Sequence, residues 1–73
     1  MNNSNILHNY KEWLEHHQMP AGKKKTLVAA IELFSQQGYN GTSTAQIAEK
    51  AGVSQATIFK YFKTKSELLS EIM

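Results

Sequence analysis

Apolar residues recur at helical spacing along this 73-residue chain. Between about residues 24 and 37, Leu27, Ala30, Ile31 and Phe34 fall on one stripe, as in an amphipathic helix that buries one face. The chain has no alternating run of strand-like length, and its few Gly and Pro residues separate helical segments. The periodicity therefore predicts an all-α protein.

An earlier segment, at about residues 5 to 18, has the same periodicity. Its apolar, aromatic and histidine positions at helical spacing are Ile6, Tyr10, Trp13, Leu14 and His17. Pro20 follows, and proline both lacks an amide donor and disfavours helix in the residue before it. We therefore expect residues 1–22 to form an N-terminal extension with an amphipathic helix, and residues 23–73 to form a separate domain.

Short motifs mark the helix ends within that domain. Residues 43–46 and 64–67 both read S/T-x-x-E/Q, the pattern of a capping box, which predicts helices at about 44 to 51 and 65 to 73.

Single residues predict the other ends. Gly38 stands where a left-handed C-cap would end the preceding helix, and Ser54 can cap a short helix at about 55 to 62. The last helix has no stop signal before Met73, so we expect a chain that is cut short. The expected fold is a three-helix bundle, preceded by an extra N-terminal helix and followed by the start of helix four.

The stretch from residue 44 to residue 61 has the spacing of a helix-turn-helix. Counting from its first residue, Ala48 is at position five, Gly52 at position nine and Ile58 at position fifteen. A small residue at position five lets the two helices approach, and glycine at position nine accepts a positive φ. An aliphatic residue at position fifteen is buried between the helices. We place the motif at about residues 43–62.

Positive charge gathers on this motif. The chain carries net +2, whereas the segment from Lys50 to Lys65 contains four Lys and no acid, and the remaining four Lys and six Glu sum to −2. The outward positions of the second helix are polar, aromatic and basic: Gln55, Ala56, Thr57, Phe59, Lys60 and Tyr61. Lysines on a solvated surface are ordinary, but spacing and charge together predict binding to double-stranded DNA in the major groove.

Residues 24 to 73 resemble the N-terminal domain of tetracycline-repressor (TetR-type) transcriptional regulators. The residues that carry the resemblance are Ala30, Phe34, Gly38-Tyr39, Thr42-Ser43, Ile47-Ala48, Ala51 to Ser54, Thr57 to Phe62, Lys65 and Leu68. The resemblance implies a DNA-binding head that reads a palindromic operator in a bacterial, cytoplasmic regulator, expected to be a ligand-released repressor. In the family a further C-terminal domain, absent here, binds a small-molecule inducer and forms the homodimer.

The resemblance also implies roles for single residues. Ser43 and Thr44 match positions that hold a backbone phosphate, and Lys65 matches a phosphate-binding lysine at the start of helix four. The start of the recognition helix matches at Gln55, Ala56 and Thr57, and its aromatic and basic end matches at Phe59, Lys60 and Tyr61. The family usually has Tyr at the position of Phe59, so a hydroxyl contact with phosphate is replaced here by packing against sugar or against a thymine methyl group.

The absence of arginine from the sequence constrains base reading. The commonest bidentate contact with guanine is missing, because lysine offers only a flexible point charge. Gln55 suits adenine, although it could equally be a plain surface residue. The other candidate base readers are Thr57, Lys60 and Tyr61. Lys23, Lys24 and Lys25 are candidates for auxiliary contacts with phosphates or the minor groove, and a solvated linker is the alternative reading.

Other function classes find little support in the sequence. There is no Cys, which excludes disulfides, zinc knuckles and thiol catalysis, and we find no catalytic constellation. The longest apolar run has five residues, against about 20 needed to span a bilayer. His8, Glu12 and His16 have a spacing that could hold a metal, but a solvated polar face is the favoured reading, so no metal or cofactor is predicted. The alternative function is a protein-interaction module that uses Tyr10, Trp13 and an open Leu68–Ile72 face.

Overall fold

The computed structural model describes Asn9, Glu12 and residues 19–72, and these residues contain helices and no strand. Four helices follow one another: α2 (Ala21–Gln37), α3 (Thr44–Ala51), α4 (Gln55–Tyr61) and α5 (Lys65–Ile72). The all-α prediction is thus confirmed. The helix expected at 5–18 lies outside the described residues, apart from Asn9 and Glu12, which are helical and exposed.

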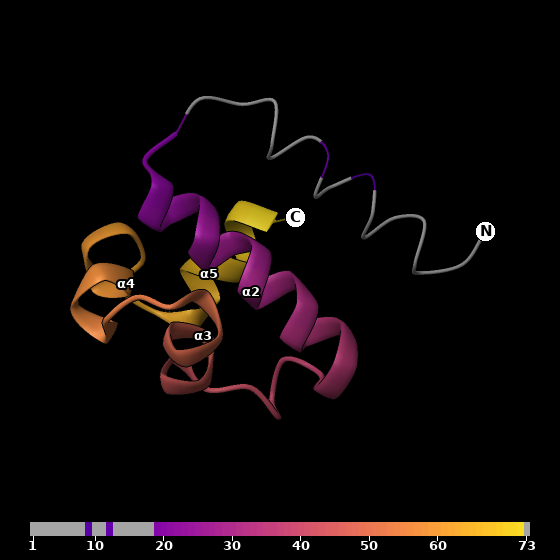
Figure 1. The fold of residues 1–73 in the computed structure, drawn as a ribbon. Coiled ribbons are helices and arrows are strands. Elements are labelled where there is room, and N and C mark those ends of the chain that lie inside the picture. The colour runs from indigo at the N-terminus through magenta and orange to yellow at the C-terminus, as the bar shows by residue number, and fades with distance from the viewer. Residues whose placement is uncertain (1–8, 10–11, 13–18, 73) are drawn as a thin grey trace.

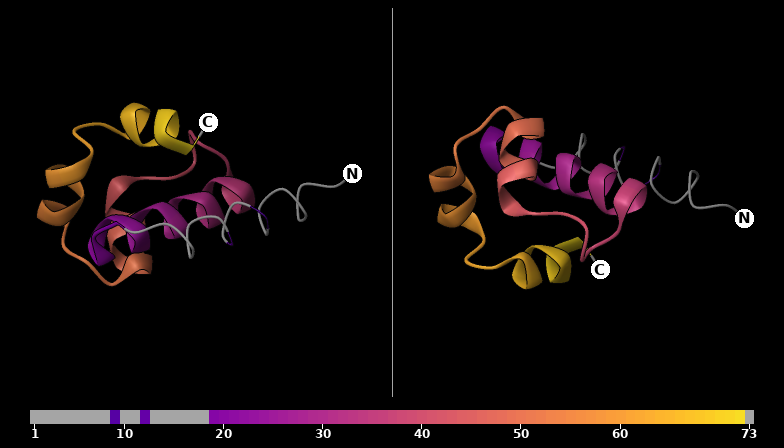
Figure 2. Two further views of the ribbon diagram at one scale, coloured as in Figure 1. Left: turned by 90° about the horizontal axis from the view of Figure 1, so that it is seen from above. Right: turned by 90° about the horizontal axis from the view of Figure 1, so that it is seen from below.

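Helix α2 is the centre of the domain, since it contacts α3, α4 and α5 (Figure 1). Both views in Figure 2 show α4 at one end of the molecule, α3 across the first part of α2, and α5 set to one side of this pair. The turn at 52–54 joins α3 to α4 and is too short to separate them, so the two helices pack against each other as well as against α2. This arrangement is the predicted helix-turn-helix.

The core lies where the four helices converge. Its buried apolar residues are Leu27, Ala29, Ala30, Ile31, Ile47, Ala48, Ile58, Phe62 and Leu68. Ala48 and Ile58, predicted to be the interior positions of the motif, are 5% and 1% exposed. Leu68 is fully buried because α5 folds back against α2, so the expectation of an open face at Leu68 is wrong. Ile72 is partly buried against the same core.

The first helix of the domain begins earlier than predicted. Pro20 is the N-cap of α2, and its carbonyl oxygen accepts a hydrogen bond from the Lys24 amide at 3.0 Å. Proline is compatible with a helix start because the first amides have no intrahelical partner in any case. Gly22 then lies inside the first turn, where an added Cβ would stand 3.0 Å from Thr57 Cγ2 of α4. The absence of a side chain at Gly22 therefore lets α2 and α4 approach closely.

Two glycines have positive φ, as the turns require. Gly52 ends α3 in the left-handed region, with φ 72° and ψ 31°, as the motif predicts. Gly38 ends α2 with φ 80° and ψ 164°, which is outside the left-handed helical region that the sequence led us to expect. A positive φ with ψ of about 180° is essentially restricted to glycine, and at Gly38 it directs the chain into the loop to α3. Helix α4 ends at Tyr61, one residue before the predicted end, since Phe62 is extended.

Candidate nucleic-acid interface

The start of α3 is fixed by the predicted capping box. The Gln46 amide donates to Ser43 Oγ at 3.1 Å, and the Ser43 amide donates to Gln46 Oε1 at 3.0 Å. The next two amides, of Thr44 and Ala45, have no acceptor within an α-helix by geometry. A helix start of this kind attracts a phosphate through its free amides and its dipole. Ser43 is exposed and Thr44 is half-buried, so the residues that match phosphate-binding positions lie at the surface.

An open hollow of about 490 Å³ lies beside this helix start. Its lining residues are Asn40, Gly41, Thr42, Ser43, Thr44, Gln46 and Lys65. The structure therefore brings together all three residues that match phosphate-binding positions, although Lys65 is far from the other two in sequence. Lys65 is the charged residue among those that line the hollow, and none of them is an acid.

The second helix of the motif starts at Ser54, whose Oγ accepts a hydrogen bond from the Thr57 amide at 3.1 Å. Four of the six predicted outward residues are exposed: Gln55, Ala56, Phe59 and Lys60. Residues four apart on a helix are neighbours, so Gln55 lies beside Phe59 and Ala56 lies beside Lys60. Phe59 is 48% exposed, whereas the other large hydrophobic residues in the described part of the chain are buried or half-buried.

Thr57 and Tyr61 differ from the prediction, because both are half-buried. They lie one helical turn apart on the side of α4 that faces α2, where Thr57 Cγ2 and the Tyr61 ring approach Gly22. The Thr57 hydroxyl also lies 3.1 Å from Ser54 Oγ. Their placement on a fully outward face is therefore wrong, and base contacts are expected first from the four exposed residues.

The two helix starts are connected by a side-chain contact. Thr44 Oγ1 donates to Gln55 Oε1 at 3.3 Å, which links the start of α3 to the start of α4. The residues that match phosphate-binding and base-reading positions are thus adjacent in space.

Three of the four lysines of the basic segment, Lys50, Lys63 and Lys65, have polar partners. Lys50 pairs with Glu32 of α2 at 3.3 Å, whereas Lys63 Nζ donates to the Phe59 carbonyl at 3.1 Å. Lys65 Nζ donates to two carbonyl oxygens of the loop between α2 and α3. A carboxylate offsets the charge of Lys50, while a carbonyl offsets none, so the positive field at the motif comes mainly from residues 60–65. Sequence reasoning missed the Lys65 contacts because their partners are main-chain groups 23 and 26 residues away.

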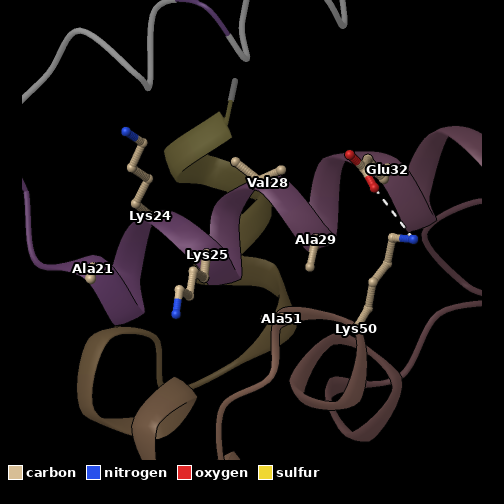
Figure 3. Close-up of a pocket in the computed structure, with 8 residues that line it drawn as sticks. All are labelled: Ala21, Lys24, Lys25, Val28, Ala29, Glu32, Lys50 and Ala51. Atoms are coloured by element: carbon tan, nitrogen blue, oxygen red, sulfur yellow. Dashed lines mark ion pairs between the residues drawn. The ribbon is translucent and has the colours of Figure 1, made fainter.

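The three consecutive lysines of α2 are also not equivalent. Lys23 pairs with Glu71 of α5 at 3.4 Å, and its ammonium lies 5.8 Å from the centre of the Phe62 ring. Figure 3 shows the Lys24 and Lys25 side chains leaving α2 in opposite directions, at an open groove of about 440 Å³. Lys25 is exposed and Lys24 is half-buried. Among the three candidates for auxiliary contacts, Lys25 is the most accessible.

The described residues show neither a metal-ligand cluster nor a membrane-spanning helix. They contain no group of three His, Cys, Asp or Glu side chains that could hold a metal ion, and no helix among them is long and apolar enough to cross a membrane. His8 and His16, of the candidate metal spacing, lie outside the described residues. Tyr10 and Trp13, of the alternative interaction surface, lie outside them as well.

The fold and the exposed face of α4 define a helix-turn-helix DNA-binding domain. Residues 27–72 match the family described as "Bacterial regulatory proteins, tetR family". The chain belongs to this family, as its sequence resemblance led us to expect, and its described part contains the helix-turn-helix of such a domain. Proteins of this family bind double-stranded DNA. Because they are regulators, the family gives no support to an enzymatic function.

Three relatives illustrate the extent of the similarity. The uncharacterized HTH-type transcriptional regulator YvkB of Bacillus subtilis is 48% identical over 50 residues, which cover 68% of this chain and 26% of YvkB. The regulator AcrR of Shigella flexneri is also 48% identical over 50 residues, covering 68% and 23%. RutR of Escherichia coli K12 is 45% identical over 53 residues, covering 73% and 25%. The chain thus spans about a quarter of the length of these relatives. No solved structure matches it significantly.

Proposed function

We propose that this chain is the operator-reading head of a homodimeric repressor in the bacterial cytoplasm, released from DNA by a small-molecule inducer. The observation that carries the DNA-reading part is the exposed face of α4 beside the capped start of α3. The shared family and the names of the relatives, which are transcriptional regulators, support the regulatory part. In this proposal the DNA-binding domain begins with α2 at Ala21, two residues before the predicted boundary at residue 23, because Gly22 packs against α4; the residues before Ala21 form the extension. The inducer and the second subunit would engage a further domain of the full-length regulator.

In this proposal α4 enters the major groove with its exposed residues toward the bases. Gln55 presents an amide, which pairs best with adenine, and Lys60 presents a cation to phosphate or to guanine. Ser43 and Thr44 hold a phosphate at the start of α3 and so fix the angle at which α4 enters the groove. Ala56 completes the exposed surface toward the groove, and the accessible parts of the half-buried Thr57 and Tyr61 border it. Lys25 extends the positive field of the protein along the phosphate backbone of the DNA.

The proposal is tested by removing one charge at a time. Replacing Lys60 by Met should weaken binding to all duplex sequences and lower the slope of log K against log salt by about 0.9, the value for one phosphate contact. The matched control is Lys50→Met, because Lys50 already pairs with Glu32. Fluorescence anisotropy of a labelled mixed-sequence duplex across a salt series measures both slopes.

Equal slopes for the parent chain and the Lys60 variant would show that Lys60 makes no phosphate contact. A parent chain with no salt-dependent binding would contradict DNA binding by the isolated head. It would then favour the alternative interaction function.

A second prediction concerns the exposed ring of α4. Phe59→Ala should weaken binding to the preferred operator and leave the salt slope unchanged, because an apolar contact releases no counterion. Folding stability should change little, since the side chain is about half exposed. Replacing single thymines by uracil removes only the methyl group. If Phe59 packs on a thymine methyl, one uracil position should weaken the parent chain and have no effect on the Ala variant. If it packs on sugar, no uracil position should distinguish the two proteins.

A further inference from the structure

The loop of residues 38–43 presents the phosphate-binding start of α3, so its conformation decides where Ser43 stands. Several contacts within the loop hold it. Thr42 Oγ1 donates to the Gly38 carbonyl at 2.7 Å, and Gln37 Nε2 donates to the Gly41 carbonyl at 2.8 Å. A side chain at Gly41 would collide with the Gln37 carbonyl oxygen. The loop is therefore tightly packed against the end of α2.

A side chain of α5 also holds this loop. Lys65 Nζ donates to the Tyr39 carbonyl at 2.7 Å and to the Thr42 carbonyl at 2.9 Å. The same ammonium lies 4.2 Å from the centre of the Tyr39 ring, within the range of a cation–π interaction. Two carbonyl oxygens and an aromatic face thus surround a half-buried cation. Hydrogen bonds of this kind, to a charged donor, are stronger than those between neutral groups.

The position of this ammonium is in turn fixed by α5. Lys65 is the first residue of that helix, and Thr64 Oγ1 accepts a hydrogen bond from the Glu67 amide at 3.1 Å. Glu67 Oε2 accepts one from the Lys63 amide at 2.9 Å, and Leu68 is buried one turn further on. The start of α5 is therefore well anchored, and Lys65 extends from it to the loop.

An ammonium group has three donors and no acceptor. Two of the three donors of Lys65 are engaged by the loop, which leaves one for a phosphate. A lysine that only binds a phosphate, the role implied by the family resemblance, would not need hydrogen bonds to two carbonyl oxygens or an aromatic ring beneath it. The contacts instead make the loop conformation dependent on Lys65 before any DNA is bound.

We propose that Lys65 is a positioning residue. It holds the loop of residues 38–43 through the carbonyl oxygens of Tyr39 and Thr42, and thereby orients Ser43 and the start of α3 for a DNA phosphate. The proposal rests on the proposed DNA-binding function for its consequence, but its structural part concerns the free protein. Loss of the ammonium should shift the loop locally and leave the buried core in place.

The test compares Lys65→Met with Lys60→Met, each of which removes one charge and keeps an unbranched side chain. In ¹H–¹⁵N spectra of the free 73-residue chain, Lys65→Met should move the amide signals of residues 40–46, and Lys60→Met should leave them unchanged. Lys65→Arg, which retains donors for both carbonyls, should return these signals toward the parent positions. On a labelled duplex, Lys65→Met should bind roughly tenfold more weakly or worse, since charged hydrogen bonds are lost.

Unchanged signals for residues 40–46 in Lys65→Met would overturn the proposal and leave Lys65 as a phosphate ligand alone. If Lys65→Met does not fold, Lys65→Gln tests the same contacts, because its side-chain amide is uncharged and ends one bond short of the ammonium position. It should move the same amide signals, and unchanged signals in that variant would also overturn the proposal. If the parent chain bound no DNA, the proposed function would fail, while the spectra of the free protein would still decide the role of Lys65.

Discussion

Fusing the chain to a dimerising partner should raise its affinity for a palindromic operator about a thousandfold. In the proposed function α4 is the one recognition helix of the head, which can therefore read one half-site. Two-fold regulators read two half-sites one helical turn, or a multiple of it, apart. The isolated chain is expected to bind weakly, with strong salt dependence and little discrimination, because most of its affinity comes from phosphate contacts.

The magnitude follows from effective concentration. If one head binds at about 10 μM, a value typical of largely electrostatic contact, a second tethered head at about 10 mM effective concentration gives about 10 nM for the pair. The measurement is fluorescence anisotropy of the chain and of its dimeric fusion on a palindrome obtained by in vitro selection with the fusion. A duplex with one half-site scrambled is the control, on which the fusion should gain far less. Tight, specific binding by the unfused chain would contradict this reasoning and would indicate that the chain dimerises by itself.

Replacing Gly52 by Val should destabilise the domain by about 1–3 kcal/mol. Gly52 has φ 72° and ψ 31°, a left-handed conformation that a β-branched residue resists. An added Cβ at Gly52 would meet no atom within 4 Å, so the cost arises from the backbone and not from a clash. Because small domains have total stabilities of only about 5 kcal/mol or little more, the loss should be readily visible in thermal or urea unfolding.

Two variants isolate the cause. Ser35→Val introduces the same side chain at an exposed position of α2 and should cost about 0.5 kcal/mol or less. Gly52→Ala should lie between the two, since alanine has a Cβ but no branch. A Gly52→Val protein as stable as the Ser35 variant would show that the turn relaxes without strain.

The local elements of this domain follow from local sequence. The capping box of Ser43 and Gln46 starts α3 because both partners lie within one helical turn, so no distant contact is needed. Gly52 is left-handed for a similarly local reason, since it must end one helix and redirect the chain into the next. The burial of Ala48 and Ile58 also follows from spacing, because the turn length fixes which faces of α3 and α4 meet.

The candidate DNA-binding surface was predictable only in part. Gln55, Ala56, Phe59 and Lys60 are exposed as expected, whereas Thr57 and Tyr61 turn toward α2. Periodicity gives the angular order of residues around α4, but it does not give how far the start of α2 reaches over that helix. Gly22 decides this point, because the absence of a side chain there allows the close approach.

By itself, the sequence determined the helical class, the helix-turn-helix and the family, since each rests on spacings within a few helical turns. Only the tertiary structure decided the destinations of the long side chains. Lys50 and Lys65 are both cations in the basic segment, yet one pairs with a carboxylate and the other holds two carbonyl oxygens of a distant loop. A flexible lysine side chain reaches whichever acceptor the packing of helices places near it, and that packing is a property of the whole domain.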